Sequence, residues 1–147
     1  MKHQLALIFH LMAATIWVGG HLFLTIRYLP KALKEKDVNS IKNFEEKFEP
    51  VGLPALLILV ITGIIMAYDY GVTFSDWFSF SNAIERVVSI KLLLLFLSLS
   101  LAVHARLFII PKLDQAKLNS MAFHIVLVTL IGVSMLVLGT FVRFGGI

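Results

Sequence analysis

The stretch FHLMAATIWVGGHLFLTIR, residues 9–27, decides the fold of this chain. It is apolar enough to cross a lipid bilayer, yet it contains two histidines. Because a helix turns about 100° per residue, a helix continued back to the N-terminus carries four side chains on one stripe: His3, His10, Trp17 and His21. Ionisable side chains inside a membrane span are costly and usually face protein or water. The stripe is therefore a candidate functional site.

The rest of the chain is just as apolar. Hydrophobic residues make up 59% of the 147 residues, compared with about 45–50% in ordinary soluble domains. Four segments reach the roughly 20 residues that a helix needs to cross about 30 Å of hydrocarbon: residues 5–28, 52–70, 84–110 and 120–144. We predict an all-α integral membrane protein, a bundle of four transmembrane helices that forms one domain over residues 1–147.

The basic residues predict the orientation of this bundle. The chain has 13 Lys and Arg residues and a formal net charge of +4. Nine of them follow the first or the third span: Arg27, Lys31, Lys34, Lys36, Lys42, Lys47, Arg106, Lys112 and Lys117. Cytoplasmic loops carry such an excess of Lys and Arg. We therefore expect both termini outside, in a bacterial inner membrane, and we expect the lipid bilayer rather than nucleic acid as the partner.

The first connection has a pattern of its own. Apolar side chains recur in it at helical spacing between charged ones, namely Val38, Ile41, Phe44 and Phe48. With Asp37 or Asn39 as an N-cap, this pattern predicts a short amphipathic helix lying on the cytoplasmic surface. We expect the first span to end near Pro30, a helix breaker, and Pro50 and Pro54 to turn the chain into the second span.

Three histidines predict an inner site. The chain has no cysteine, so a metal would depend on His, Met, carboxylate or backbone ligands. His21, His104 and His124 each lie within about one or two turns of the cytoplasmic boundary, on three different spans. Helix bundles build metal and cofactor sites from such facing side chains. The alternative is that each imidazole only forms an interhelical hydrogen bond.

A second level lies nearer the outside. His10, Lys91 and Met135 fall at comparable depths if the helices are straight. Histidine and methionine at two depths are the soft ligands that a Cu(I) site or passage needs, although Met135 could simply fill space in the core. Lys91 is about 140° out of register with His104 on the third span, so Lys91 could instead snorkel to the interface or bond a backbone carbonyl.

The same residues are open to a haem interpretation. Two histidine levels in a bundle could hold b-type haem between paired imidazoles. In the simplest interpretation, Arg27 and Arg106 anchor their helices at the membrane boundary. In the haem interpretation, they pair with the haem propionates. Trp17, on the histidine stripe, would then line the cofactor site.

Three segments resemble a known family. They are FHLMAATIWVGG at residues 9–20, FEPVGLPALLILVITG at residues 48–63 and IKLLLLFLSLSLAVHARL at residues 90–107. Together they resemble the copper resistance D (CopD)-like membrane proteins and, more distantly, the four-helix protoporphyrinogen oxidase family called HemJ. The CopD resemblance implies an inner-membrane protein that handles copper. The HemJ resemblance implies functional roles for His10 and Lys91, with b-type haem and a quinone-linked oxidation.

Our leading hypothesis is a metal-binding membrane protein that binds or moves copper without covalent chemistry, so that no residue is catalytic. His21, His104 and His124 form its inner site, and His10 with Met135 forms its outer one. The alternative is a haem b redox protein linked to quinone, which alone would make it an enzyme, a membrane oxidoreductase. A periplasmic copper protein is a candidate partner, and the sequence leaves a homodimer open.

Overall fold

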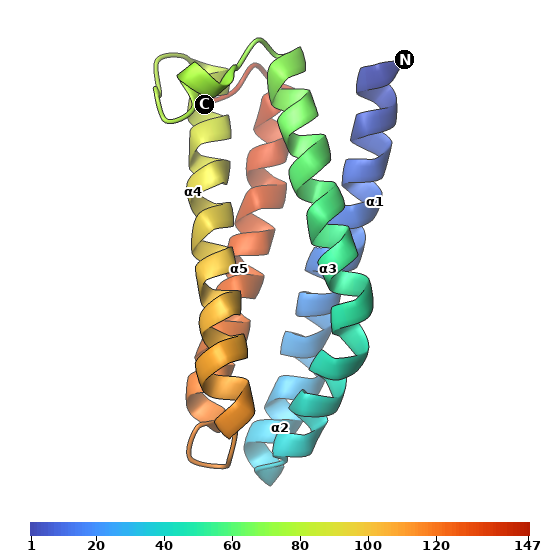
Figure 1. Cartoon of the computed structure of the whole chain (residues 1–147), viewed down its shortest axis with the longest axis vertical. Helices are drawn as coiled ribbons and strands as arrows, with labels where there is room; N and C mark the ends of the chain where they lie inside the picture. The colour runs from blue at the N-terminus through green and yellow to red at the C-terminus, as the bar shows by residue number, and fades with distance from the viewer.

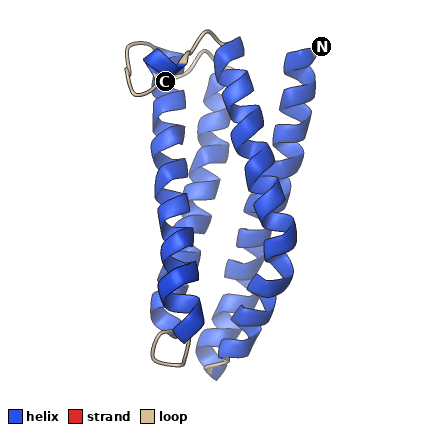
Figure 2. Ribbon diagram, viewed as in Figure 1, coloured by secondary structure: helices blue, strands red, loops and turns tan.

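Four long helices run antiparallel along one axis (Figures 1 and 2). The computed structural model describes residues 1–147. Each helical segment is long and apolar enough to cross a membrane: Lys2–Glu35, Val38–Asp69, Ala83–Lys112 and Leu118–Val142. There are no strands. The prediction of an all-α bundle with four membrane-spanning helices is confirmed.

The four helices do not close into a symmetrical ring. α1 (Lys2–Phe23) packs along α3 (Val38–Asp69) and also contacts α5 (Leu118–Val142), which in turn packs against α4 (Ala83–His104). α3 and α4 meet at very few positions. Both termini lie at the same end of the bundle (Figure 1). The predicted common side for the termini therefore agrees with the structure, while its assignment to the outside remains a prediction.

The first span does not end at Pro30 as predicted. A π-helical turn, Leu24–Tyr28, leads directly from α1 into α2 (Leu29–Glu35). In this turn the N–H of Leu29 donates to the carbonyl of Leu24, five residues back. The wider turn shifts the hydrogen-bond pattern by one residue just before Pro30, which has no N–H to donate. The helix therefore passes the proline and ends at Lys36, which adopts a left-handed conformation.

The predicted surface helix also differs from the structure. A helix does begin at Val38, capped by the Asp37 carboxylate, which accepts hydrogen bonds from the N–H groups of Asn39 and Ser40. The hydroxyl of Ser40 also donates to this carboxylate and lowers the pKa of Asp37. However, the helix continues through Pro50 into the second span instead of lying apart on the membrane.

The apolar face of this segment is covered by protein rather than by lipid. Ile41 is fully buried, and the Phe44 ring lies 5.2 Å from the Tyr28 ring, centroid to centroid. The first connection thus packs against the end of the first span. Since the same apolar side chains would serve a membrane-surface helix equally well, their spacing alone could not distinguish the two arrangements.

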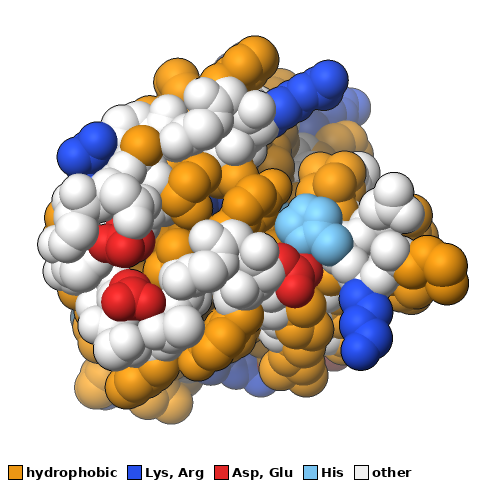
Figure 3. Space-filling model, turned by 90° about the horizontal axis from the view of Figure 1, so that it is seen from above, with side chains coloured by type: hydrophobic (Ala, Val, Ile, Leu, Met, Phe, Trp, Pro, Cys, Tyr) orange, Lys and Arg blue, Asp and Glu red, His pale blue; other side chains and the backbone are white.

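The largest group of buried apolar residues lies at the end of the bundle opposite the termini. It joins all four helical segments: Leu24, Leu29, Ala32, Ile41, Ala105, Ile109, Leu113, Leu118, Met121 and Ile125. The other end is held by polar contacts. There the His3 ring and the Asp69 carboxylate are 2.9 Å apart, and Figure 3, which views this end, shows a histidine beside an acidic side chain. The histidines of the predicted inner site lie at the same end of the bundle as this buried group, which holds the four helices together there.

Candidate metal site

The histidine stripe of α1 faces α3. His3 contacts Asp69, and His10 lies 2.8 Å from the hydroxyl oxygen of Thr62. His21 packs edge-on against the ring of Phe48, with 5.6 Å between centroids. Each stripe histidine therefore meets a different residue of α3, and none of them contacts another histidine.

A cavity of about 320 Å³ lies between the four helices on the side away from the termini. Most of its lining is apolar, and its polar lining includes His21 from α1, His124 from α5 and Arg106 next to α4. The buried thioether of Met121 also lines it. We call this space the inner cavity. It brings together two of the three histidines predicted for the inner site.

His21 has one ring nitrogen engaged and one available. Its Nδ1–H donates to the backbone carbonyl oxygen of Trp17, 2.8 Å away. A carbonyl only accepts hydrogen bonds, so Nδ1 carries the proton and Nε2 keeps its lone pair. The Trp17 ring lies beside His21, tilted by 51°, with 4.5 Å between ring centroids. Trp17 was predicted to line a cofactor site. In the structure its carbonyl orients His21, and its side chain lines the inner cavity.

His104 and His124 form a direct pair across α4 and α5. The Nδ1 of His104 lies 2.9 Å from the Nε2 of His124, and the two rings are nearly parallel, 12° apart. The Nδ1–H of His124 donates to the carbonyl oxygen of Ser120 at 2.9 Å. For neutral imidazoles, His104 must then be the donor to His124. One proton thus bridges two of the predicted ligand nitrogens: Nδ1 of His104 carries it and the Nε2 lone pair of His124 accepts it.

At the outer level, the four helices surround the imidazole of His10 and the ammonium of Lys91. The Nδ1–H of His10 donates to Thr62, whose own hydroxyl donates to the carbonyl of Ile58. Side chains at Gly63 and Gly139 would meet His10 and the Lys91 ammonium, respectively, at 3.5 Å. Both distances are ordinary van der Waals contacts, so each polar group lies directly against the neighbouring helix. Lys91 therefore lies inside the bundle at this level rather than at its surface.

Met135 and Arg27 lie apart from these groups. Met135 is half-buried on α5 and does not line the inner cavity, and Arg27 is exposed in the π-helical turn. Arg106, by contrast, forms an ion pair with Glu49 of α3, with 2.5 Å between nitrogen and oxygen. Neither Glu49 nor Glu45, one turn before it, was predicted as a site residue. Their spacing of four residues on an amphipathic helix was the only signal for them.

In this structure the His104 and His124 rings leave no space for a ligand between them. Two imidazoles that ligate one iron from opposite sides hold their nitrogens about 4 Å apart, whereas these nitrogens are in hydrogen-bond contact at 2.9 Å. A haem iron, like a copper ion, would require the two rings to move apart, and the haem alternative remains a prediction. No group of three or more His, Cys, Asp or Glu side chains gathers at a single point. What the structure offers is a two-imidazole pair, with a thioether and a third imidazole lining the adjoining cavity.

A family model described as CopD, copper resistance protein D, matches residues 42–144. This chain belongs to the CopD family. No curated protein and no solved structure matches it. The prediction of a CopD-like protein is confirmed, and the more distant relation to HemJ remains a prediction.

CopD membership establishes a multi-pass membrane protein involved in copper resistance. The matched region contains the His104 and His124 pair, Met121 and the Glu49 and Arg106 ion pair. His10 and His21 precede it. The family match thus covers the imidazole pair and the part of the cavity lining that comes from α3, α4 and α5, but not the part that comes from α1.

Proposed function

We propose that this CopD protein binds Cu(I) as its cargo between the imidazoles of His104 and His124, with the thioether of Met121 as a third ligand. The observation that carries the proposal is the 2.9 Å contact between the two ring nitrogens. Imidazole and thioether are soft ligands that favour Cu(I). Since the chain has no cysteine, no thiolate competes with them.

Copper would replace the shared proton. Metal–imidazole bonds are about 2 Å long, so an ion between the two nitrogens would separate them to about 3.5 Å in a trigonal site with Met121, or about 4 Å in a linear one. The rings must therefore move apart by up to about 1 Å. The proton on Nδ1 of His104 would pass to Nε2 of the same ring, which has no partner within the protein. Copper binding at this pair then needs no net release of a proton.

Met121 and His21 line the inner cavity together with His124, whereas His104 is exposed and does not line it. Met121 lies three residues before His124, on the same face of α5, and its side chain is 3% exposed. His21 lines the same cavity as His124 and Met121 and has a free Nε2 lone pair. We assign His21 the next binding position, to which an ion would move by ligand exchange.

The outer level is less suited to a cation. It holds one imidazole, His10, together with the ammonium of Lys91, which would repel a copper ion in a medium of low dielectric constant. Of the residues at the outer level, we retain only Met135 as a proposed copper ligand. The excess of basic residues at the other end supports an orientation in a bacterial inner membrane with the inner cavity toward the cytoplasm.

A copper competition experiment tests this function. The detergent-purified protein is loaded with Cu(I) under anaerobic, reducing conditions and titrated with a chromophoric Cu(I) chelator. We expect one tightly held Cu(I) per chain in the wild type and in His3→Ala, because His3 lies at the opposite end of α1 from the cavity. Wild-type protein that gives up all its copper to a weak chelator would contradict the proposal.

A further inference from the structure

A second cavity adjoins the inner one at the water-facing end of the helices. It has a volume of about 740 Å³ and lies between α3 and the end of the third span. Its polar lining comes from Lys42, Glu46 and other charged residues of the first turns of α3. We call it the vestibule. Charged residues at its rim place it next to the aqueous phase rather than the lipid.

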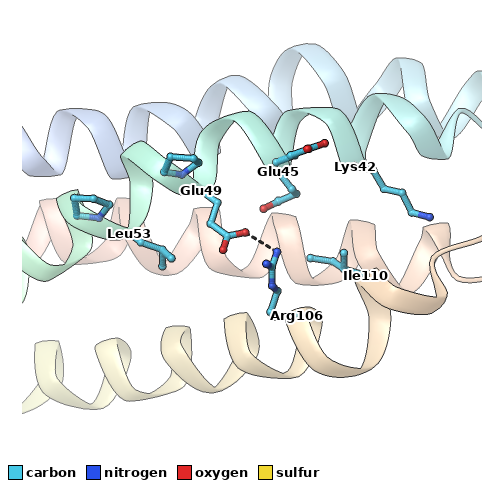
Figure 4. Close-up of a pocket in the computed structure, with 9 residues that line it drawn as sticks. Lys42, Glu45, Glu49, Leu53, Arg106 and Ile110 are labelled. Carbon is cyan, nitrogen blue, oxygen red and sulfur yellow. Dashed lines mark hydrogen bonds and ion pairs between the residues drawn. The ribbon is translucent and has the colours of Figure 1, made fainter.

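The two cavities share one wall. Glu45, Glu49 and Arg106 line both of them. Glu49 reaches from α3 toward Arg106 on the neighbouring span, and their ion pair crosses the space between the two helices (Figure 4). α3 and α4 hardly pack against each other elsewhere, and this ion pair is a direct polar contact between the two spans in the wall that the two cavities share.

The charges around this wall suit a cation that enters from the vestibule. Glu45 has no hydrogen-bond or ion-pair partner, although it faces both cavities. Glu49 is neutralised only by Arg106, and both side chains remain partly exposed, at 34% and 57%. A partly exposed ion pair contributes little free energy and opens easily. An arriving cation would replace Arg106 as the counter-charge of Glu49.

Both residues of the ion pair lie where a helix is irregular. Arg106 is part of the π-helical turn Ala105–Ile109, and Glu49 directly precedes Pro50 inside α3. π-helical turns and internal prolines weaken the regular hydrogen-bond ladder and allow a helix to bend. The backbone on each side can thus move without disrupting the rest of the span.

We propose that the Glu49 and Arg106 ion pair is a gate between the vestibule and the inner cavity, and that Glu45 receives the cation as it passes. The gate rests on the proposed function for the identity of that cation, Cu(I). Its position and its opening do not depend on which cation passes.

A thiol placed in the inner cavity tests the gate without copper. The chain has no native cysteine, so Ala102→Cys, in the lining of the inner cavity, provides a single reactive site. Its rate of reaction with a charged, water-soluble methanethiosulfonate reports access from the vestibule. Adding Glu49→Gln is expected to raise this rate roughly two- to fivefold, because an exposed ion pair holds the closed state only weakly. Exchanging the two charges, with Glu49→Arg and Arg106→Glu together, should restore the slow rate.

The matched control is Glu46→Gln, which removes a carboxylate from the vestibule but not from the shared wall. Equal thiol rates in the Glu49→Gln and Glu46→Gln proteins would overturn the gate. Copper exchange provides the second readout: Glu49→Gln should speed Cu(I) uptake and release with an unchanged Kd. A weakened Kd would instead make Glu49 a ligand and also overturn the gate. A wild type that binds no Cu(I) would refute the proposed function, while the thiol rates would still decide the gate.

Discussion

The His124→Ala protein is expected to bind Cu(I) at least about 100-fold more weakly than the wild type, since even residues that only support metal ligands change affinity by about 10- to 100-fold. His124 contributes the acceptor nitrogen of the imidazole pair and lines the inner cavity. Its loss leaves His104 without the partner that positions the ring. The measurement is the Kd obtained by competition with a chelator of known affinity.

Two further variants make this result specific. His104→Ala should lose a similar amount, and the double variant should be little worse than either single one, because both rings hold the same ion. His10→Ala removes an imidazole of the outer level and should leave the Kd unchanged. Independent, additive losses from His104 and His124 would show that the two rings do not share one copper ion.

Gly20→Leu is expected to destabilise the protein by about 3 kcal/mol, at the upper end of the usual cost of overpacking. A Cβ at Gly20 would lie 2.2 Å from the ring of Phe48, which is also confined by Gly52 on its other side. The ring cannot retreat without disturbing its packing against His21. Equilibrium unfolding in mixed micelles measures the change in the free energy of unfolding.

The neighbouring glycine is the control. A Cβ at Gly19 would have no atom within 4 Å, and this residue is exposed on the outside of α1. Gly19→Leu should therefore leave stability within about 0.5 kcal/mol of the wild type, as most surface substitutions do. If the two variants unfold alike, Phe48 does not occupy the position between α1 and α3 that the structure gives it.

Hydropathy and charge were enough to predict the architecture. Four apolar segments of sufficient length could only be spans. Asp37 and Asn39 were both N-cap candidates from their place before an amphipathic pattern, and the structure shows Asp37 in that role. The backbone detail could not be predicted. A π-helical turn depends on a shift in hydrogen bonding that leaves no mark in the spacing of apolar side chains. For this reason Pro30 was interpreted as a helix end, although the helix continues past it. Pro50 was also expected to break the helix, but α3 continues through it.

The depth of the candidate site residues along the bundle could be predicted from the sequence. The direction in which each helix points them could not. Counting residues from the membrane boundary placed His104 and His124 at one level, and the structure brings them into contact. Counting could not tell that His21 turns toward α3, or that Met135 stays away from the inner cavity. Those outcomes depend on how each helix is rotated about its axis, which is set by packing. The Glu49 and Arg106 pair depends in addition on which helices are neighbours.

X-ray absorption at the copper K edge of the Cu(I)-loaded protein tests the central claim most directly. We predict a first shell of two imidazole nitrogens at about 2.0 Å and one sulfur at about 2.3 Å, typical lengths for such metal–ligand bonds. One imidazole should disappear from the spectrum of His104→Ala, and the sulfur from that of Met121→Leu. A spectrum that is the same in the wild type and in His104→Ala would show that copper is not held by this pair of histidines.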